Sequence, residues 1–136
     1  MVFMDHHELL LDKAMIPGSL GVLGDLALRL AEFYPRPLET FSLLLFAGDH
    51  GIHAEGVTHS PQKITFQQVR SFASGGGACG LFSKLNGVDL KIIDVGVAGS
   101  FDPSHRVIDR KVGFGTKNFL HEKAMTDEEC ASAIEV

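Results

Sequence analysis

The fold of this chain is decided by the stretch Phe41-Ser42-Leu43-Leu44-Leu45-Phe46-Ala47-Gly48-Asp49-His50-Gly51. Residues 41–47 form an apolar run whose length and composition are typical of a strand buried on both faces of a parallel sheet. The run leads directly into a polar turn flanked by glycine. Ligands of open α/β sheets bind outside the carboxyl ends of the strands, so this turn is the first candidate site.

A second strand and several helices are predicted after this turn. Ser60 and Pro61 provide an N-cap and a first-turn proline for a helix over 61–73, and a shorter helix is expected over 79–85. A strand is expected over 90–95, and the glycine-rich stretch 96–120 is expected to be irregular. A strand, helices and a second strand in this order predict an α/β fold with a parallel sheet.

The two ends of the chain are predicted to be helical. Leucines at helical spacing predict a helix over 19–34, capped by Ser19 and ended by the prolines of 35–37. Thr126 and Glu129 form a capping box, so a helix is expected from there to Val136. We expect an N-terminal helical segment, 1–36, and a partial α/β domain, 37–136. Because no C-cap precedes Val136, we expect the chain to be a portion of a longer protein.

Composition excludes several classes of protein. A chain of 136 residues with 45% hydrophobic and 21% charged residues is typical of a globular domain rather than a disordered tail. A net charge of -5 argues against a nucleic-acid partner. No apolar run approaches the roughly 18 residues of a membrane span, so no membrane partner is expected. Two distant cysteines and the absence of a signal peptide predict a cytoplasmic location.

The turn after the first strand has three interpretations. Asp49, His50, His53 and His59 are residue types that bind zinc or manganese, which suggests a metal-dependent phosphoesterase. Their spacing is poor for a shared ion, and we favour a metal-free binding loop. In the third interpretation, Asp49 caps a turn and His50 is solvated.

Two glycine-rich segments and one acidic residue are further candidates. The glycines of 74–80 either cradle an anion before a helix or permit close packing of two helices. The segment 113–118 either binds a phosphate or carboxylate or is an ordinary surface turn. Asp94, at the end of the second strand, is either a ribose-binding acid or a turn cap.

A series of short motifs, in order along the chain, resembles one known family. The motifs are Pro17–Gly21, Asp25–Ala27, Phe46–Gly51, Glu55–Val57, Pro61–Thr65, Gly75–Ala78, Ile93–Val97, Gly115–Asn118 and Ala124–Thr126. Together they resemble nicotinate-nucleotide–dimethylbenzimidazole phosphoribosyltransferases, the CobT family of vitamin B12 assembly. The resemblance covers the chain from about Lys13 onward.

The resemblance implies an activity and an architecture. The family exchanges the nicotinate of nicotinate mononucleotide for 5,6-dimethylbenzimidazole, giving α-ribazole 5′-phosphate for the lower ligand of cobalamin. It implies a Rossmann-like parallel sheet with flanking helices, and N-terminal helices that contribute to a small helical subdomain. It also implies a homodimer, small-molecule substrates, and no metal or bound cofactor.

The resemblance also implies which residues bind the substrates. Asp49 and His50 match the loop that borders the site, and the segment 56–65 matches the lining of the benzimidazole pocket. The expected substrate-binding residues are Asp49, His50, Thr58, Pro61, Thr65, Gln67 and Asp94. The family's catalytic glutamate and its phosphate-binding Gly-Asn-Thr segment would lie beyond Val136, so we assign no catalytic residue and expect this chain alone to be inactive.

The chain departs from the family pattern near its N-terminus. Met15, Ile16, Val22 and Gly24 stand where the family commonly has lysine, proline, arginine and glutamate. An alternative function of another class is also open, a non-catalytic module that binds an aromatic base or a partner protein.

Overall fold

The computed structural model describes residues 20–34 and 39–136, and the chain divides into two compact units, 1–40 and 41–136. Helix α2 (Val22–Phe33) belongs to the first unit. It confirms the helix predicted over 19–34 but begins three residues later, because Gly21 has a φ of 50° that an α-helix does not adopt. Ser19, Met15 and Ile16 lie outside the described residues.

The second unit contains a parallel three-stranded sheet. Its strands lie in the order β1 (Ser42–Gly48), β2 (Asp89–Gly96) and β3 (Val107–Asp109). The predicted α/β fold with a parallel sheet is thus confirmed. Strand β3 lies inside the stretch 96–120 that was expected to be irregular. It pairs over three residues only, too few to produce a recognisable pattern in the sequence.

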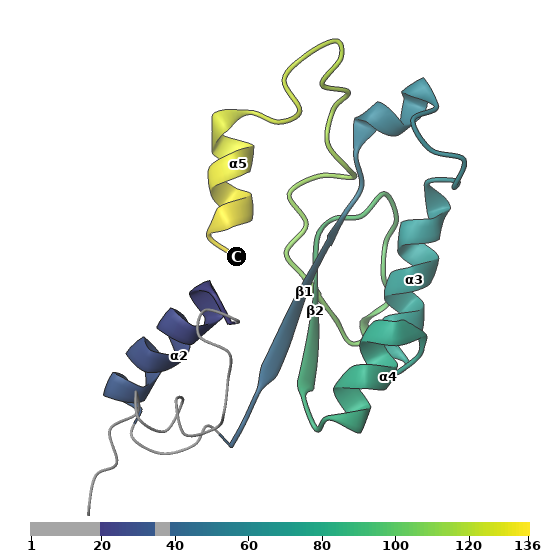
Figure 1. Cartoon of the computed structure of the whole chain (residues 1–136). Coiled ribbons are helices and arrows are strands. Elements are labelled where there is room, and N and C mark those ends of the chain that lie inside the picture. Colours follow the sequence, from purple (N-terminus) through teal and green to yellow (C-terminus); the bar gives the residue numbers. More distant parts are fainter. Residues whose placement is uncertain (1–19, 35–38) are drawn as a thin grey trace, which may run out of the picture. The chain divides into compact units, whose positions relative to one another are not determined.

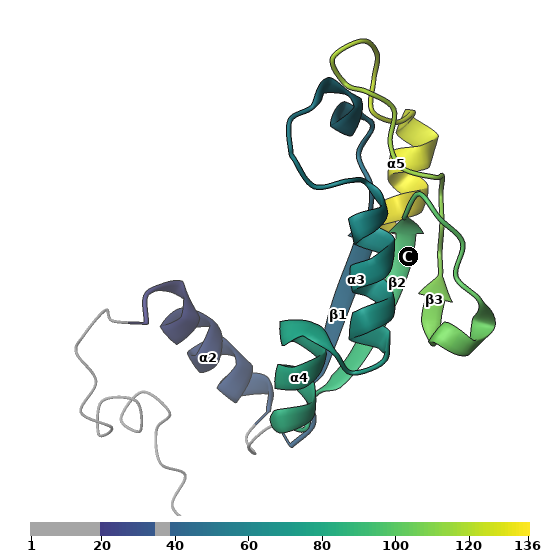
Figure 2. The same cartoon turned by 90° about the vertical axis from the view of Figure 1, so that its right-hand side faces the viewer.

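Two helices connect β1 to β2 and pack on one face of the sheet. They are α3 (Lys63–Ala73) and α4 (Gly77–Leu85), and α5 (Asp127–Ile134) lies on the opposite side, near the carboxyl ends of the strands (Figures 1 and 2). Helix α3 begins two residues after the predicted Pro61, with Gln62 as its N-cap. Between α3 and the sheet lies a small core of Ala47, Val69, Ile92 and Val97.

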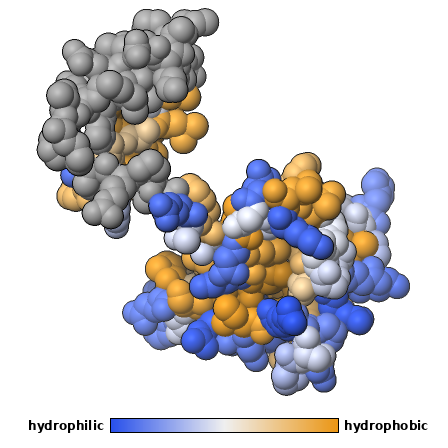
Figure 3. All heavy atoms as spheres, turned by 90° about the horizontal axis from the view of Figure 1, so that it is seen from below, coloured by the Kyte–Doolittle hydropathy of each residue, from blue (hydrophilic) through white to orange (hydrophobic). Residues whose placement is uncertain are grey.

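The expectation that the first strand is buried on both faces is wrong. Leu45 and Ala47 face the core beneath α3, whereas Leu44 and Phe46, on the opposite face, are 52% and 53% exposed. Strand β1 is also an edge of the described sheet, so the backbone groups along its outer side pair with no other described strand. Figure 3 shows hydrophobic side chains gathered in the middle of the visible face of this unit, with hydrophilic side chains around them.

The glycine-rich stretch between α3 and α4 permits close packing. A Cβ at Gly80 would lie 2.7 Å from the carbonyl carbon of Gly75, and one at Gly77 would lie 2.5 Å from the ring of Phe72. Side chains at these positions would therefore force the end of α3 and the start of α4 apart. Of the two interpretations of this segment, the structure bears out helix packing.

Within the described ranges, the helices are too short or too polar to cross a membrane.

Candidate functional site at the carboxyl ends of the strands

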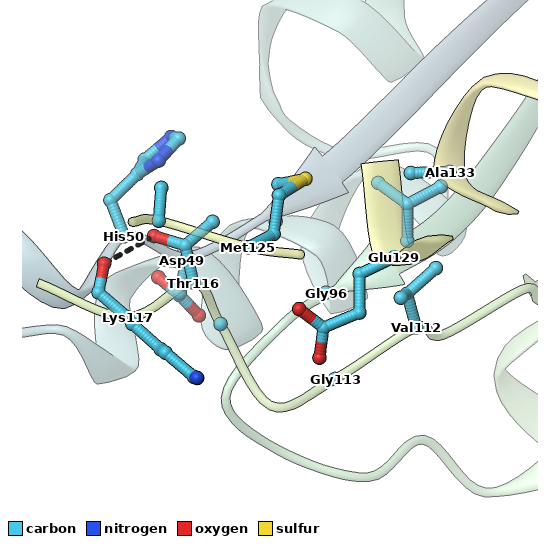
Figure 4. A pocket seen from close by; sticks show the side chains of 14 residues that line it. Asp49, His50, Gly96, Val112, Gly113, Thr116, Lys117, Met125, Glu129 and Ala133 are labelled. Atoms are coloured by element: carbon cyan, nitrogen blue, oxygen red, sulfur yellow. Dashed lines mark hydrogen bonds between the residues drawn. The ribbon is translucent and has the colours of Figure 1, made fainter. Parts of the chain in front are cut away.

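A pocket of about 280 Å³ opens at the carboxyl ends of β1 and β2. Four parts of the chain form it: the end of β1 with the turn after it, the end of β2, the segment 112–117, and α5 with the residues just before it (Figure 4). Its lining combines glycine backbone and small apolar side chains with a few polar groups, a composition typical of small-molecule sites. The lining residues are Gly48, Asp49, His50, Val95, Gly96, Val112, Gly113, Gly115, Thr116, Lys117, Ala124, Met125, Glu129 and Ala133.

Asp49 lines this pocket and also holds its walls together. Its side chain is buried, and Oδ2 accepts a hydrogen bond of 2.7 Å from the backbone N–H of Ala98. Its backbone carbonyl accepts a hydrogen bond of 3.0 Å from the N–H of Thr116, and its own N–H donates to Gly96 at 2.9 Å. Asp49 therefore joins the carboxyl ends of β1 and β2 to the segment that follows β3.

His50 is the exposed member of the pair that the sequence singled out. It forms the N-cap position of the short 3-10 helix η1 (Gly51–Glu55) with an extended backbone. Its ring and the carboxylate of Glu129 stand at opposite sides of the pocket in Figure 4. An imidazole at the mouth of an apolar pocket can bind a polar substituent of a ligand.

Asp94 has a different environment from that of Asp49. The side chain is 2% exposed, and Oδ1 accepts hydrogen bonds from the N–H groups of Gly96 and Val97 at 3.1 and 2.8 Å. Oδ2 pairs with Nζ of Lys111 at 2.6 Å. Of its two interpretations, the structure shows the turn cap. Asp94 does not line the pocket, although Val95 and Gly96 next to it do.

Lys111 was not singled out by the sequence analysis. Its ammonium group donates to Asp94 and to the carbonyl of Val97, both at 2.6 Å, and lies 4.9 Å from the ring centre of Phe114. These partners hold Lys111 against the end of β2, so that Val112 and Gly113 reach the pocket wall. No local sequence pattern predicts this role, because Lys111 lies within a stretch without helical or strand periodicity.

Glu129 lines the pocket, a role that its sequence pattern did not predict. The predicted capping box is confirmed: Oε2 of Glu129 accepts from the N–H of Thr126 at 2.7 Å, and Oγ1 of Thr126 accepts from the N–H of Glu129 at 3.1 Å. The same carboxylate extends toward Gly113 and Gly96 in the pocket (Figure 4). The capping pattern by itself explains a glutamate at this position. The sequence therefore contains no separate pattern that would indicate a role of Glu129 in the pocket.

The other predicted substrate-binding residues do not line this pocket. Thr58 is exposed, and its hydroxyl accepts a hydrogen bond of 3.2 Å from the N–H of Ser60. Pro61 is exposed just before α3, and Thr65 is half-buried on that helix. Gln67 lines a separate, open hollow together with Arg70, Ser71, Ser74 and His105. The segment 56–67 therefore presents its polar groups away from the strand-end pocket.

The proposed metal ligands are not gathered at one point. His53 bonds through Nε2 to the carbonyl of Ser60 at 2.9 Å, and the carboxylate of Asp49 accepts from Ala98. Among the residues that the structure describes, no three histidine, cysteine or acidic side chains lie together as a metal site requires.

Comparison with known proteins identifies the relatives of this chain. A family model described as Phosphoribosyltransferase (DBI_PRT) matches residues 4–136. The nicotinate-nucleotide–dimethylbenzimidazole phosphoribosyltransferase of Citrifermentans bemidjiense is 40% identical over 129 residues, covering 92% of this chain and 37% of that protein. The enzyme of that name from Janthinobacterium sp. (strain Marseille) is 40% identical over 121 residues, covering 87% of this chain and 35% of its own length.

A solved structure shows the same fold. The crystal structure of CobT from Thermus thermophilus superimposes with a TM-score of 0.76 at 37% sequence identity. The match covers 89% of this chain and 37% of that protein, so this chain spans just over a third of the length of the relatives it matches. Because the family model matches almost the whole chain, this protein belongs to the DBI_PRT phosphoribosyltransferase family.

Proposed function

We propose that this chain forms part of a phosphoribosyltransferase site that exchanges the nicotinate of nicotinate mononucleotide for 5,6-dimethylbenzimidazole. The product would be α-ribazole 5′-phosphate, the precursor of the lower ligand of cobalamin. One observation carries the proposal. The motifs shared with the family, 46–51, 93–97 and 115–118, converge on a single pocket at the carboxyl ends of the parallel strands.

The chemistry requires two bound substrates in line. A nitrogen of the benzimidazole forms a bond to the anomeric carbon of the ribose, the bond from that carbon to the nicotinate nitrogen breaks, and a base takes the benzimidazole N–H proton. We propose that this chain binds and orients the substrates through the strand-end pocket and the segment 56–67. Asp94 is not assigned as the base, because its carboxylate is already bonded to Lys111 and to two N–H groups.

The assembly is proposed from the family resemblance, and the location from the two distant cysteines and the N-terminal sequence. We propose that the protein is a cytoplasmic homodimer acting on small molecules, without metal or bound cofactor. We also propose that the protein is divided into an N-terminal helical segment, 1–36, and a partial parallel α/β domain, 37–136. Sedimentation velocity of the purified chain tests the dimer directly: a single monomeric species across micromolar concentrations would contradict it.

Binding of 5,6-dimethylbenzimidazole tests the assignment of the base to the segment 56–67. In calorimetric titrations, the double variant Thr58→Val, Gln67→Ala is expected to bind at least about tenfold more weakly than the wild type. The expected loss corresponds to about 1.4 kcal/mol, the order of one or two polar contacts.

Two matched controls accompany this titration. Thr58→Ser retains the hydroxyl group, and Gln68→Ala removes a neighbouring exposed amide from α3, so both are expected to bind like the wild type. Equal affinity of the double variant, or no binding by a folded wild-type chain, would contradict the assignment.

A further inference from the structure

Two loops that are more than sixty residues apart in sequence are joined by hydrogen bonds beside the pocket. The N–H of Gly51 donates to Oγ1 of Thr116 at 3.2 Å, and the N–H of Thr116 donates to the carbonyl of Asp49 at 3.0 Å. Farther out, Nδ2 of Asn118 donates to Oε1 of Glu55 at 2.6 Å. We call the contact between residues 49–55 and 116–121 the loop junction.

The loop junction is tight as well as hydrogen-bonded. A Cβ at Gly51 would lie 2.5 Å from the carbonyl carbon of Lys117 and 2.6 Å from the backbone nitrogen of Asn118. The two backbones are therefore in direct contact, without side chains between them. A small displacement of 116–121 is transmitted to 49–55, because close-packed groups cannot move independently.

Glu55 lies at the outer end of the loop junction, directly before the segment 56–67. It is the last residue of η1 and precedes Gly56, which ends that helix with a φ of 68°. Thr58 follows two residues later. The carboxylate of Glu55 is thus a tether directly before the segment 56–67, which His53 also holds through its bond to the carbonyl of Ser60.

Asn118 commits both polar atoms of its side chain within the protein. Nδ2 bonds to Glu55, and Oδ1 accepts from the N–H of Leu120 at 3.0 Å. His121 also reaches Oε1 of Glu55, at 3.0 Å. Its side chain is 66% exposed, and its ring shares this oxygen with the amide of Asn118.

We propose that Asn118 is a positioning residue for the base-binding segment. It acts through Glu55, which it holds in place, and thereby sets where Gly56 and Thr58 stand; it does not contact the base. This inference rests on the proposed function, which assigns the base to 56–67. It gives the Gly-Thr-Lys-Asn motif a role in loop placement, where the sequence left a choice between an anion site and a surface turn.

An exchange of donor and acceptor tests the proposal. Asn118→Asp keeps the bond to Leu120 but turns a carboxylate toward Glu55, and we expect the affinity for 5,6-dimethylbenzimidazole to fall about tenfold. Adding Glu55→Gln places an amide donor opposite the new carboxylate. The double variant is expected to recover to within about twofold of the wild type, since the bond is restored with reversed polarity.

A matched control separates this effect from a simple change of charge. Asn86→Asp introduces the same charge at the end of α4, where Nδ2 of Asn86 donates to the carbonyl of Phe82. It is expected to bind the base like the wild type. An equal loss of affinity in Asn86→Asp and Asn118→Asp would overturn the proposal.

A second readout needs no ligand. In NMR spectra of the free protein, the amide of Gly56 is expected to shift in Asn118→Asp and to return in the double variant. An unchanged Gly56 amide, or a shift that the double variant does not reverse, overturns the positioning role. A wild type that binds no base while the amides behave as expected rejects the proposed function but supports the loop placement.

Discussion

Lys111→Met is expected to lower the free energy of unfolding by about 3–5 kcal/mol, the cost of removing one partner from a buried ion pair. Methionine matches the aliphatic part of the lysine side chain in length but provides no donor. It therefore leaves the carboxylate of Asp94, which is 2% exposed, without its cation. Chemical denaturation monitored by circular dichroism measures this change in free energy. The dependence of the unfolding free energy on denaturant concentration shows whether unfolding remains two-state.

Two further variants distinguish the buried pair from lysine removal in general. Lys91→Met breaks the exposed pair with Asp89, whose atoms are 3.7 Å apart, and is expected to cost less than about 1 kcal/mol. Asp94→Asn added to Lys111→Met removes the unpaired charge while keeping an oxygen for Gly96 and Val97, so part of the lost stability returns. Equal costs for Lys111→Met and Lys91→Met would show that the buried pair does not stabilise the pocket wall.

Gly51→Ala is expected to lower the free energy of unfolding by about 1–3 kcal/mol, the usual cost of an overpacked contact. The new methyl group meets backbone atoms of Lys117 and Asn118 at 2.5 and 2.6 Å, and backbone cannot rotate away as a flexible side chain can. The two loops must separate, which breaks the hydrogen bond from Gly51 to Thr116. Changes in the NMR shifts of the amides of 116–118 report the separation of the loops, and thermal denaturation measures the loss of stability.

Gly24→Ala is the matched control for this substitution. Gly24 lies within α2, and the nearest atom to a Cβ there is the Leu20 Cβ at 3.4 Å. Because alanine favours helix over glycine by up to about 1 kcal/mol, this variant is expected to be neutral or slightly stabilising. If Gly51→Ala behaved in the same way, the loop junction would be looser than its geometry indicates.

Local patterns predicted the main elements well. The apolar run 41–47 and the shorter strand 90–95 appear as β1 and β2, because strands of a parallel sheet need apolar side chains wherever a helix layer covers them. The capping box of Thr126 and Glu129 placed the start of α5, since capping depends on residues three apart. Asp49 and His50 were predicted to be site residues because they follow a strand directly. Both line the strand-end pocket, and their contact with a substrate stays a prediction.

Predictions that depended on contacts between distant parts of the chain were less accurate. Burial of both faces of β1 was wrong, since burial depends on which layers cover the sheet and an apolar sequence does not specify them. Strand β3 was missed because its three residues pair with β2 through the sheet rather than through a periodic pattern of their own. The contact of Thr58 and Gln67 with a ligand likewise depends on the tertiary placement of the segment 56–67. This contact stays a prediction.

The order of the main elements, the parallel α/β class, the N-cap of α5 and the turn that forms one wall of the pocket follow from residues close together in the chain. These properties arise from backbone preferences and apolar spacing within a few residues. The pairing of Lys111 with Asp94, the position of Glu129 in the pocket and the bond from Asn118 to Glu55 depend on how distant segments fold together. Such pairs form between segments brought together by burial of the core, and no short-range pattern records which buried charge or loop amide will face which partner.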